Sequence, residues 1–183
     1  NSLQIVILAG YSAVGKSTIG SNFSEKYDWN LIKHQKLVHG IAVSKGYERA
    51  RYWLADVGIN AFMSESATEM IRRVRKIENP KGILIDASYG STMIHSLKKA
   101  FPEAKIATVA ILAESGTRED RMMTRMGVER GAAKIEKDFR DHFLKDAGVE
   151  KVIAEADITI YNNGETEAAI EEISNRLRER KFN

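Results

Sequence analysis

Two glycines, a lysine and a serine near the start of the chain have the spacing of a phosphate-binding site. Gly10 and Gly15 enclose four residues, and Lys16 and Ser17 follow directly, which matches the P-loop pattern G-x-x-x-x-G-K-[ST]. The glycines let the backbone turn so that successive N–H groups point at one anion. The lysine reaches the β- and γ-phosphates of a nucleotide, and the serine hydroxyl coordinates Mg²⁺. The predicted nucleotide-binding residues of this loop are Gly10, Ser12, Ala13, Val14, Gly15, Lys16, Ser17 and Thr18.

The segments on either side of this loop predict a strand–loop–helix unit. The run Leu3–Ala9 is mostly apolar, and Ser17–Glu25 is compatible with a helix. The positive end of that helix dipole would add to phosphate binding. The alternative is a glycine-rich turn that binds nothing, and it leaves both flanking elements unexplained.

An aspartate ends another apolar run, Ile83–Asp86. In a protein with a P-loop, a carboxylate at the end of such a strand is placed to act on Mg²⁺ or to serve as a general base. The alternative is that Asp86 caps the helix expected from Ser91. We predict that Asp86 is catalytic and that Ser17 and Asp86 are the metal-binding residues.

Three arginines have the spacing of one helix face. Arg118, Arg121 and Arg125 stand at i, i+3 and i+7, and a segment with two glycines separates them from a second helical stretch. A mobile hairpin with arginines can close on ATP, neutralise charge in the transition state and exclude water. The alternative is a solvated helix face with acidic partners. We predict that residues 115–146 form a lid and that Lys16, Arg121 and Arg125 act in catalysis with the aspartate.

The elements that must position these residues alternate between strands and helices. Near-continuous apolar strands indicate a parallel sheet covered by helices on both faces, an α/β fold. Crossovers should be right-handed, and ligands should bind beyond the carboxyl ends of the strands. The expected strands are Gln4–Ala9, Asn30–Lys33, Gly82–Ala87, Lys105–Leu112 and Asp157–Tyr161.

Residues 34–79 contain no convincing strand and are longer than a single crossover helix requires. The clearest helical pattern lies there, from Ile59 to Val74, and the last helix is expected over Glu165–Arg180. We interpret 34–79 as a helical insertion that binds the phosphoryl acceptor. Since no repeat or linker is visible, residues 1–183 are predicted to form one domain.

Composition limits the kind of partner. The chain has 29% charged and 43% hydrophobic residues, a formal net charge of +3 and no cysteine, so disulfides and thiolate metal sites are excluded. The four histidines show no metal-binding spacing. No apolar run approaches the length of a membrane span, so we expect a cytoplasmic protein without a membrane partner. Basic and acidic residues are interspersed, which favours a small phosphate-rich ligand over nucleic acid.

Together, several motifs resemble P-loop nucleoside and nucleotide kinases, nearest to dephospho-coenzyme A kinase and adenylate-kinase-like proteins. They are the P-loop, the arginine helix, the pair Arg140-Asp141 and the ending Ala156–Asn163. The resemblance implies a three-layer P-loop fold with strand order 2-3-1-4-5, ATP as phosphoryl donor and Mg²⁺ as cofactor. It matches Arg121 and Arg125 to the lid arginines of that group, and Asn162 to an asparagine at a strand end beside the adenine.

Two segments depart from that group. Relatives often have an acidic residue after the second strand, where this chain has His34-Gln35, and a Gly and an Arg after the third, where it has Ala87-Ser88-Tyr89. The identity of the acceptor is therefore open. Lys36, Arg49 or Arg51 are alternative residues for holding its anionic group.

These observations give one hypothesis and two rivals. The hypothesis is a Mg²⁺- and ATP-dependent kinase for a nucleotide, a nucleoside or a related hydroxyl or phosphate acceptor. The first rival is a sensing or regulatory module that binds ATP or GTP without phosphorylating a small molecule. The second is a kinase for the 5′ end of a polynucleotide, with a basic track formed by Lys33, Lys36, Lys45, Arg49 and Arg51.

Overall fold

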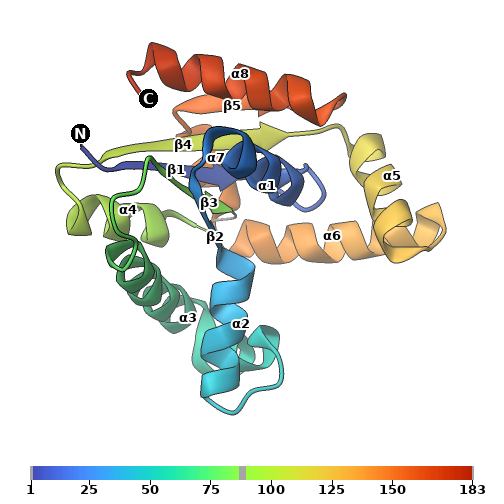
Figure 1. The fold of residues 1–183 in the computed structure, drawn as a ribbon. Coiled ribbons are helices and arrows are strands. Elements are labelled where there is room, and N and C mark those ends of the chain that lie inside the picture. Colours follow the sequence, from blue (N-terminus) through green and yellow to red (C-terminus); the bar gives the residue numbers. More distant parts are fainter. Residues whose placement is uncertain (1, 87–89, 183) are drawn as a thin grey trace.

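A five-stranded parallel sheet forms the centre of the computed structural model, which describes residues 2–86 and 90–182 (Figure 1). Its order is β2-β3-β1-β4-β5, as the resemblance implied. The strands are β1 Gln4–Ala9, β2 Asn30–Lys33, β3 Ile83–Asp86, β4 Lys105–Leu112 and β5 Ile158–Tyr161. The central strands β1 and β3 are buried on both faces, which explains their nearly continuous apolar residues.

Helices cover both faces of the sheet and make three layers (Figure 1). On one face, α1 (Lys16–Tyr27) and α8 (Thr166–Glu179) pack on alternate residues such as Val6 and Leu8. On the other face, Ile5 and Ile7 pack under helices from the middle of the chain. These helices are α2 His34–Ser44, α3 Ala50–Arg75 and α4 Ser91–Ala100. The predicted α/β class is therefore confirmed.

The expected insertion consists of α2 and α3, which pack on each other. All of residues 34–79 are described, and no strand occurs among them. Gly58 interrupts α3 with φ 80° and ψ 165°, a conformation that glycine adopts far more readily than other residues. Beyond this kink, Phe62 packs on the buried Trp53 with ring centroids 4.6 Å apart. Trp53 is thus a core residue.

The expected lid is a helical hairpin of α5 (Ser115–Met126) and α6 (Arg130–Asp146). It follows the end of β4 and projects away from the sheet (Figure 1). A small apolar cluster of Ala13, Met122 and Ala133 joins it to the P-loop.

One helix was not expected from the sequence. The short helix α7 (Val149–Ala154) packs on α4 and β4 before the chain enters β5. Among the described residues, no helix has the length and apolar character needed to cross a membrane. Part of the predicted third strand, Ala87, lies outside the described residues.

Candidate functional site

The P-loop joins the end of β1 to the start of α1 and adopts unusual backbone angles. Gly10, Ala13 and Gly15 have positive φ values of 152°, 60° and 101°. A Cβ atom on Gly10 would lie 2.4 Å from the Ile111 carbonyl oxygen, and one on Gly15 would lie 2.4 Å from Asn162 Nδ2. Both glycines are therefore required by close packing as well as by conformation.

Three consecutive carbonyl groups of the loop are held by side chains from distant parts of the chain. Arg118 Nε donates to the Ser12 oxygen at 2.7 Å, and Asn162 Nδ2 donates to the Val14 oxygen at 2.9 Å. Between them, Arg121 Nη1 donates to the Ala13 oxygen at 3.2 Å. Since the C=O and N–H of a trans peptide point in opposite directions, the following N–H groups face away from these donors. They are thereby left to bind an anion.

Lys16 lies over the loop that precedes it. Its Nζ donates to the carbonyl oxygens of Gly10 and Tyr11, both at 2.7 Å. Burial lowers the pKa of Lys16 from 10.5 to about 8, and the negative charge of Asp86 opposes that shift. The ammonium group is therefore still mainly protonated at neutral pH, where it can bind phosphate.

Asp86 is the last residue of β3, and it lies beside the end of β1. It pairs in register with Leu8, and only 4% of its surface is exposed. Its Oδ1 atom has no hydrogen-bond partner among the described residues. A buried carboxylate oxygen without a partner costs free energy, so this atom is suited to a ligand of the site.

The predicted metal residues fit Mg²⁺. Ser17 is exposed at the start of α1, and its hydroxyl and the Asp86 carboxylate are the hard oxygen donors that Mg²⁺ prefers. No group of three or more acidic or imidazole side chains that could hold a metal occurs among the described residues. Proteins usually hold Mg²⁺ with one or two side chains, while substrate phosphates and water complete its coordination.

Arg118 and Arg121 have different partners although they share a helix face. Arg118 is buried, pairs with Asp141 and lies 5.3 Å from the centre of the Tyr11 ring. Arg121 donates through Nη2 to the Asn162 oxygen at 2.7 Å, and burial lowers its pKa. The two arginines thus contact the P-loop and are not part of a solvated helix face.

Arg125 lies farther along α5 and is exposed. Its positive charge is close enough to Lys16 to lower the pKa of that residue slightly, after the larger effect of burial. The acidic residues that could have paired with these arginines instead pair with Arg130, which contacts Glu119 and Asp120. The role of Arg125 in the site therefore stays a prediction.

Residues of the expected acceptor side are arranged around the end of β2. Lys33 is in register with Asp86 on the neighbouring strand. His34 follows it as the first residue of α2 and is fully buried, and burial lowers its pKa to about 4, so the imidazole is neutral at pH 7. Lys36 and Arg49 are exposed, and Arg51 is stacked on the ring of Tyr52. Ala87, Ser88 and Tyr89 lie outside the described residues.

Sequence reasoning missed two contacts beside the P-loop. Tyr11 Oη donates to Glu150 at 2.9 Å, and burial together with this carboxylate raises the tyrosine pKa to about 12. Arg118 and Asp141 were each noticed within motifs, but their pairing was not. A signal existed in the i, i+3, i+7 spacing and in the pair Arg140-Asp141, whereas nothing in the sequence marks Glu150.

Comparison with known proteins gives similarity over nearly the whole chain. No family model matches. A UPF0200 protein of Thermococcus kodakarensis is 28% identical over 174 residues, covering 90% of this chain and 91% of the relative. Shikimate kinase from Bacteroides thetaiotaomicron superimposes with a TM-score of 0.64 at 15% identity, over 96% of this chain and 98% of that one. A gluconokinase from Sinorhizobium meliloti superimposes with a TM-score of 0.65 at 14% identity, over 96% and 92%.

The chain has the P-loop kinase fold. The fold that the resemblance implied is therefore confirmed. The two named solved structures differ in acceptor, since one is a shikimate kinase and the other a gluconokinase. At these identities the likeness shows the fold alone, and the chemistry must be argued from the residues of this chain.

Proposed function

We propose that the protein is a Mg²⁺- and ATP-dependent kinase that transfers the γ-phosphoryl group to a small acceptor. One observation carries this proposal: a P-loop with its lysine lies beside the buried Asp86, whose Oδ1 has no hydrogen-bond partner among the described residues. A carboxylate at this place can hold Mg²⁺ beside the phosphates or take a proton from a hydroxyl acceptor, and phosphoryl transfer uses both kinds of group.

Each predicted residue has a role that its position supports. The loop N–H groups and Lys16 would hold the β- and γ-phosphates, and Ser17 and Asp86 would hold Mg²⁺, which offsets negative charge on those phosphates. For a hydroxyl acceptor, Asp86 could also take its proton, whereas a phosphate acceptor is already ionised and needs no base. Arg121 would lie beside the base with Asn162, and Arg125 would stabilise the transferring group.

The experiment is coupled ADP release from ATP with a panel of acceptors. The panel contains nucleoside monophosphates, nucleosides, dephospho-coenzyme A, shikimate, gluconate and a 5′-hydroxyl oligonucleotide. We expect ADP release that depends on one class of small acceptor. Since the chain is expected to be cytoplasmic, the acceptor is expected to be a soluble metabolite with a hydroxyl or an anionic group.

The variant Lys16→Ala tests the role of the P-loop. It should lower turnover by several orders of magnitude, because it removes a positive charge that stabilises the phosphates in the transition state. The control is Lys26→Ala, a lysine on the same helix that pairs with Glu167 on the surface. Near-normal turnover of Lys16→Ala would refute the proposal.

A nucleotide-sensing module is the second candidate. It is favoured by His34, which is buried and neutral at a place where relatives often have an acidic residue. ADP release that no acceptor in the panel accelerates would support this candidate. The polynucleotide kinase receives less support, because Lys45 of its supposed basic track pairs with Glu65 at 2.7 Å.

A further inference from the structure

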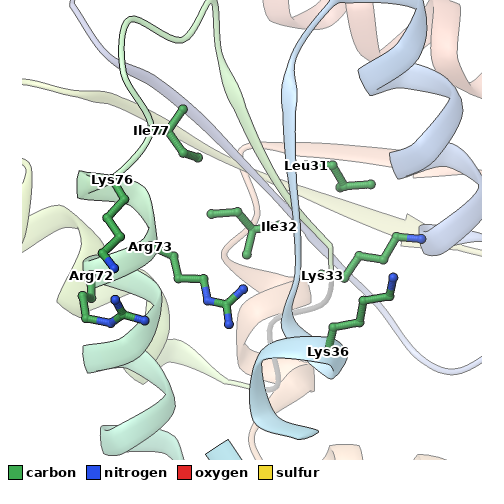
Figure 2. A pocket seen from close by; sticks show the side chains of 8 residues that line it. All are labelled: Leu31, Ile32, Lys33, Lys36, Arg72, Arg73, Lys76 and Ile77. Carbon is green, nitrogen blue, oxygen red and sulfur yellow. The ribbon is translucent and has the colours of Figure 1, made fainter. Parts of the chain in front are cut away.

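A pocket of about 510 Å³ lies along the edge of the sheet, between β2 and the C-terminal end of α3 (Figure 2). β2 is the outermost strand, so only one of its two edges is paired within the sheet. The apolar part of the lining comes from Leu31, Ile32 and Ile77. Among the described residues, none from the P-loop, the lid or the end of β3 lines this pocket, which we call the basic groove.

The basic groove gathers positive charge from two elements. Lys33 and Lys36 come from the junction of β2 and α2, and in Figure 2 their side chains extend away from three further cations, which come from α3 and its end. These are Arg72, Arg73 and Lys76.

Very little of that charge is neutralised. Glu69 pairs with both Arg72 at 2.6 Å and Arg73 at 3.1 Å. Lys33, Lys36 and Lys76 form no ion pair within the described part of the chain. Five cations and one carboxylate leave four positive charges, whereas the whole chain has a net charge of +3. The lining of this groove is therefore positively charged overall.

Protection of the sheet edge does not explain this concentration. Lysines on an edge strand discourage pairing with other chains, and Lys33 would serve that purpose. Arg72, Arg73 and Lys76 are not on the strand, and like charges gathered around one pocket repel each other. An anion in the pocket would turn that repulsion into attraction.

We propose that the basic groove binds a nucleoside polyphosphate at a second site, separate from the P-loop. Its volume lies in the range of small-molecule pockets. Arg72 donates through Nε and Nη2 to Glu69, and Arg73 reaches the same carboxylate through Nε, so the terminal nitrogens of Arg73 can match phosphate oxygens in a two-pronged geometry. Exposed lysine side chains reorient rapidly toward an anion. The apolar lining offers a surface for the base or ribose. The proposal goes beyond the kinase assignment and does not depend on phosphoryl transfer.

Nucleic acid fits this groove less well, because the cations around it are engaged elsewhere. Lys45 pairs with Glu65, Lys81 pairs with Asp28, and Arg75 is stacked on Phe101. A nucleic-acid surface needs a basic track that continues along the backbone of the polymer. The charge here ends at the rim of one pocket, which favours a compact ligand.

Isothermal titration calorimetry with ATP can count the sites. Mg²⁺ is left out, so that the protein cannot turn over ATP during the titration. We expect two sites in the wild-type protein. Lys16→Ala should keep the groove site, and the double variant Arg73→Gln/Lys76→Gln should keep the P-loop site. In the double variant the second site should weaken about tenfold or more, because charge-assisted hydrogen bonds to phosphate are lost. The control Lys98→Gln/Lys99→Gln removes equal charge from exposed positions on α4 and should keep both sites.

The proposal has several ways to fail. A single wild-type site that Lys16→Ala abolishes would overturn it, as would a second site that the double variant leaves unchanged. The thermal unfolding midpoint shows whether the double variant is folded. If it is not, the single variant Lys76→Gln tests the groove site in its place. Inorganic tripolyphosphate binding to Lys16→Ala as tightly as ATP would overturn recognition of the nucleoside. Displacement of ATP by a 5′-hydroxyl oligonucleotide at lower concentration would overturn it in favour of nucleic acid.

Since these measurements record binding alone, they remain decisive if the kinase proposal fails. A protein that releases no ADP with any acceptor can still show the groove site in Lys16→Ala. An active kinase can equally show the P-loop site only. The two proposals therefore fail separately.

Discussion

At the scale of single residues, the P-loop lysine is the group whose ionisation should be visible in binding. Burial lowers the pKa of Lys16 to about 8 in the protein without ligand. As pH rises through this value the lysine loses its charge, whereas the phosphates of ATP stay fully ionised. The affinity for ATP should therefore fall about tenfold per pH unit well above pH 8, if one proton must be regained on binding.

The measurement is a fluorescent-nucleotide titration between pH 6.5 and 10. Lys16→Ala serves as the control, because its weaker binding should lack this slope. A wild-type profile that is flat up to pH 10 would show that the lysine titrates near its ordinary value.

Two arginines of the lid allow a comparison of how much a buried and an exposed ion pair contribute to stability. Arg118 is buried, pairs with Asp141 and also holds the Ser12 carbonyl oxygen, whereas Arg130 is about half exposed in its pairs with Glu119 and Asp120. Arg118→Ala should lower the free energy of unfolding by about 2–3 kcal/mol, because it leaves partly buried acceptors without a donor. Arg130→Ala should cost about 1 kcal/mol or less.

Urea denaturation of both variants gives the comparison, and the ATP affinity gives a second readout. Arg118→Ala should also weaken ATP binding, since the loop carbonyl that orients the neighbouring N–H group loses its partner. Equal destabilisation by the two substitutions would contradict the structural role assigned to Arg118.

At the scale of elements, α3 depends on one glycine for its direction. Gly58 has φ 80° and ψ 165°, and an added Cβ would meet no atom within 4 Å. Gly58→Ala should therefore act through backbone strain alone and destabilise the protein by about 1–3 kcal/mol. Gly40→Ala is the matched control, because Gly40 is inside α2 with equally open space and should stabilise the helix by up to about 1 kcal/mol.

Thermal unfolding of both variants gives the sign of each effect. Opposite signs are expected although the substitutions are chemically identical. A loss of stability in both would mean that the space around Gly40 or the kink at Gly58 differs from that described.

The strands were predictable from sequence because their burial leaves a continuous apolar signature. Ile83–Ile85 and Ile5–Leu8 are buried on both faces, so each run is apolar at every position. Such a run can be recognised as a strand without an alternation of polar and apolar residues. α7 was not predictable, since six residues are too short for a helical period to emerge.

The spacing of the arginines predicted a shared helix face, but it could not separate their contacts. Arg118 contacts the Ser12 oxygen, Arg121 contacts Ala13 and Asn162, and Arg125 is exposed. These differences depend on where the lid rests on the P-loop, which no local pattern encodes. The catalytic roles of Lys16, Asp86 and the arginines remain predictions. The basic groove was equally hidden, because β2 and the end of α3 are about forty residues apart.

At the scale of the whole molecule, the P-loop is where independent parts of the chain meet. Ile111 at the end of β4 packs on Gly10, Asn162 after β5 holds the Val14 oxygen, and α5 supplies two arginines. Nucleotide bound to the loop would therefore stabilise contacts with the sheet and with the lid at once. The loop thus joins the core of the sheet to the helical hairpin of α5 and α6.

The lid should be the less stable of these two parts. Among the described residues, its small buried cluster consists of Ala13, Met122 and Ala133, with Met123 and Val128 packed against it. Ile135 and Phe139 on α6 are 73% and 70% exposed. The sheet, in contrast, has a large core on each face. Because local opening follows the amount of buried apolar contact, backbone amides of α6 should exchange with deuterium faster than those of β1 and β4.

Saturating ATP with Mg²⁺ should slow exchange in α5, since Arg118 and Arg121 fasten that helix to the occupied loop. At an ATP concentration a hundredfold above Kd, the free energy of local opening should rise by about 2.7 kcal/mol for amides whose opening releases the nucleotide. Hydrogen–deuterium exchange with mass spectrometry measures it, with Lys16→Ala as the control that should gain little protection. If ATP protected the ends of β1 and β4 but left α5 unchanged, the lid would open without disturbing the nucleotide, and the contacts of the two arginines would not connect lid and loop.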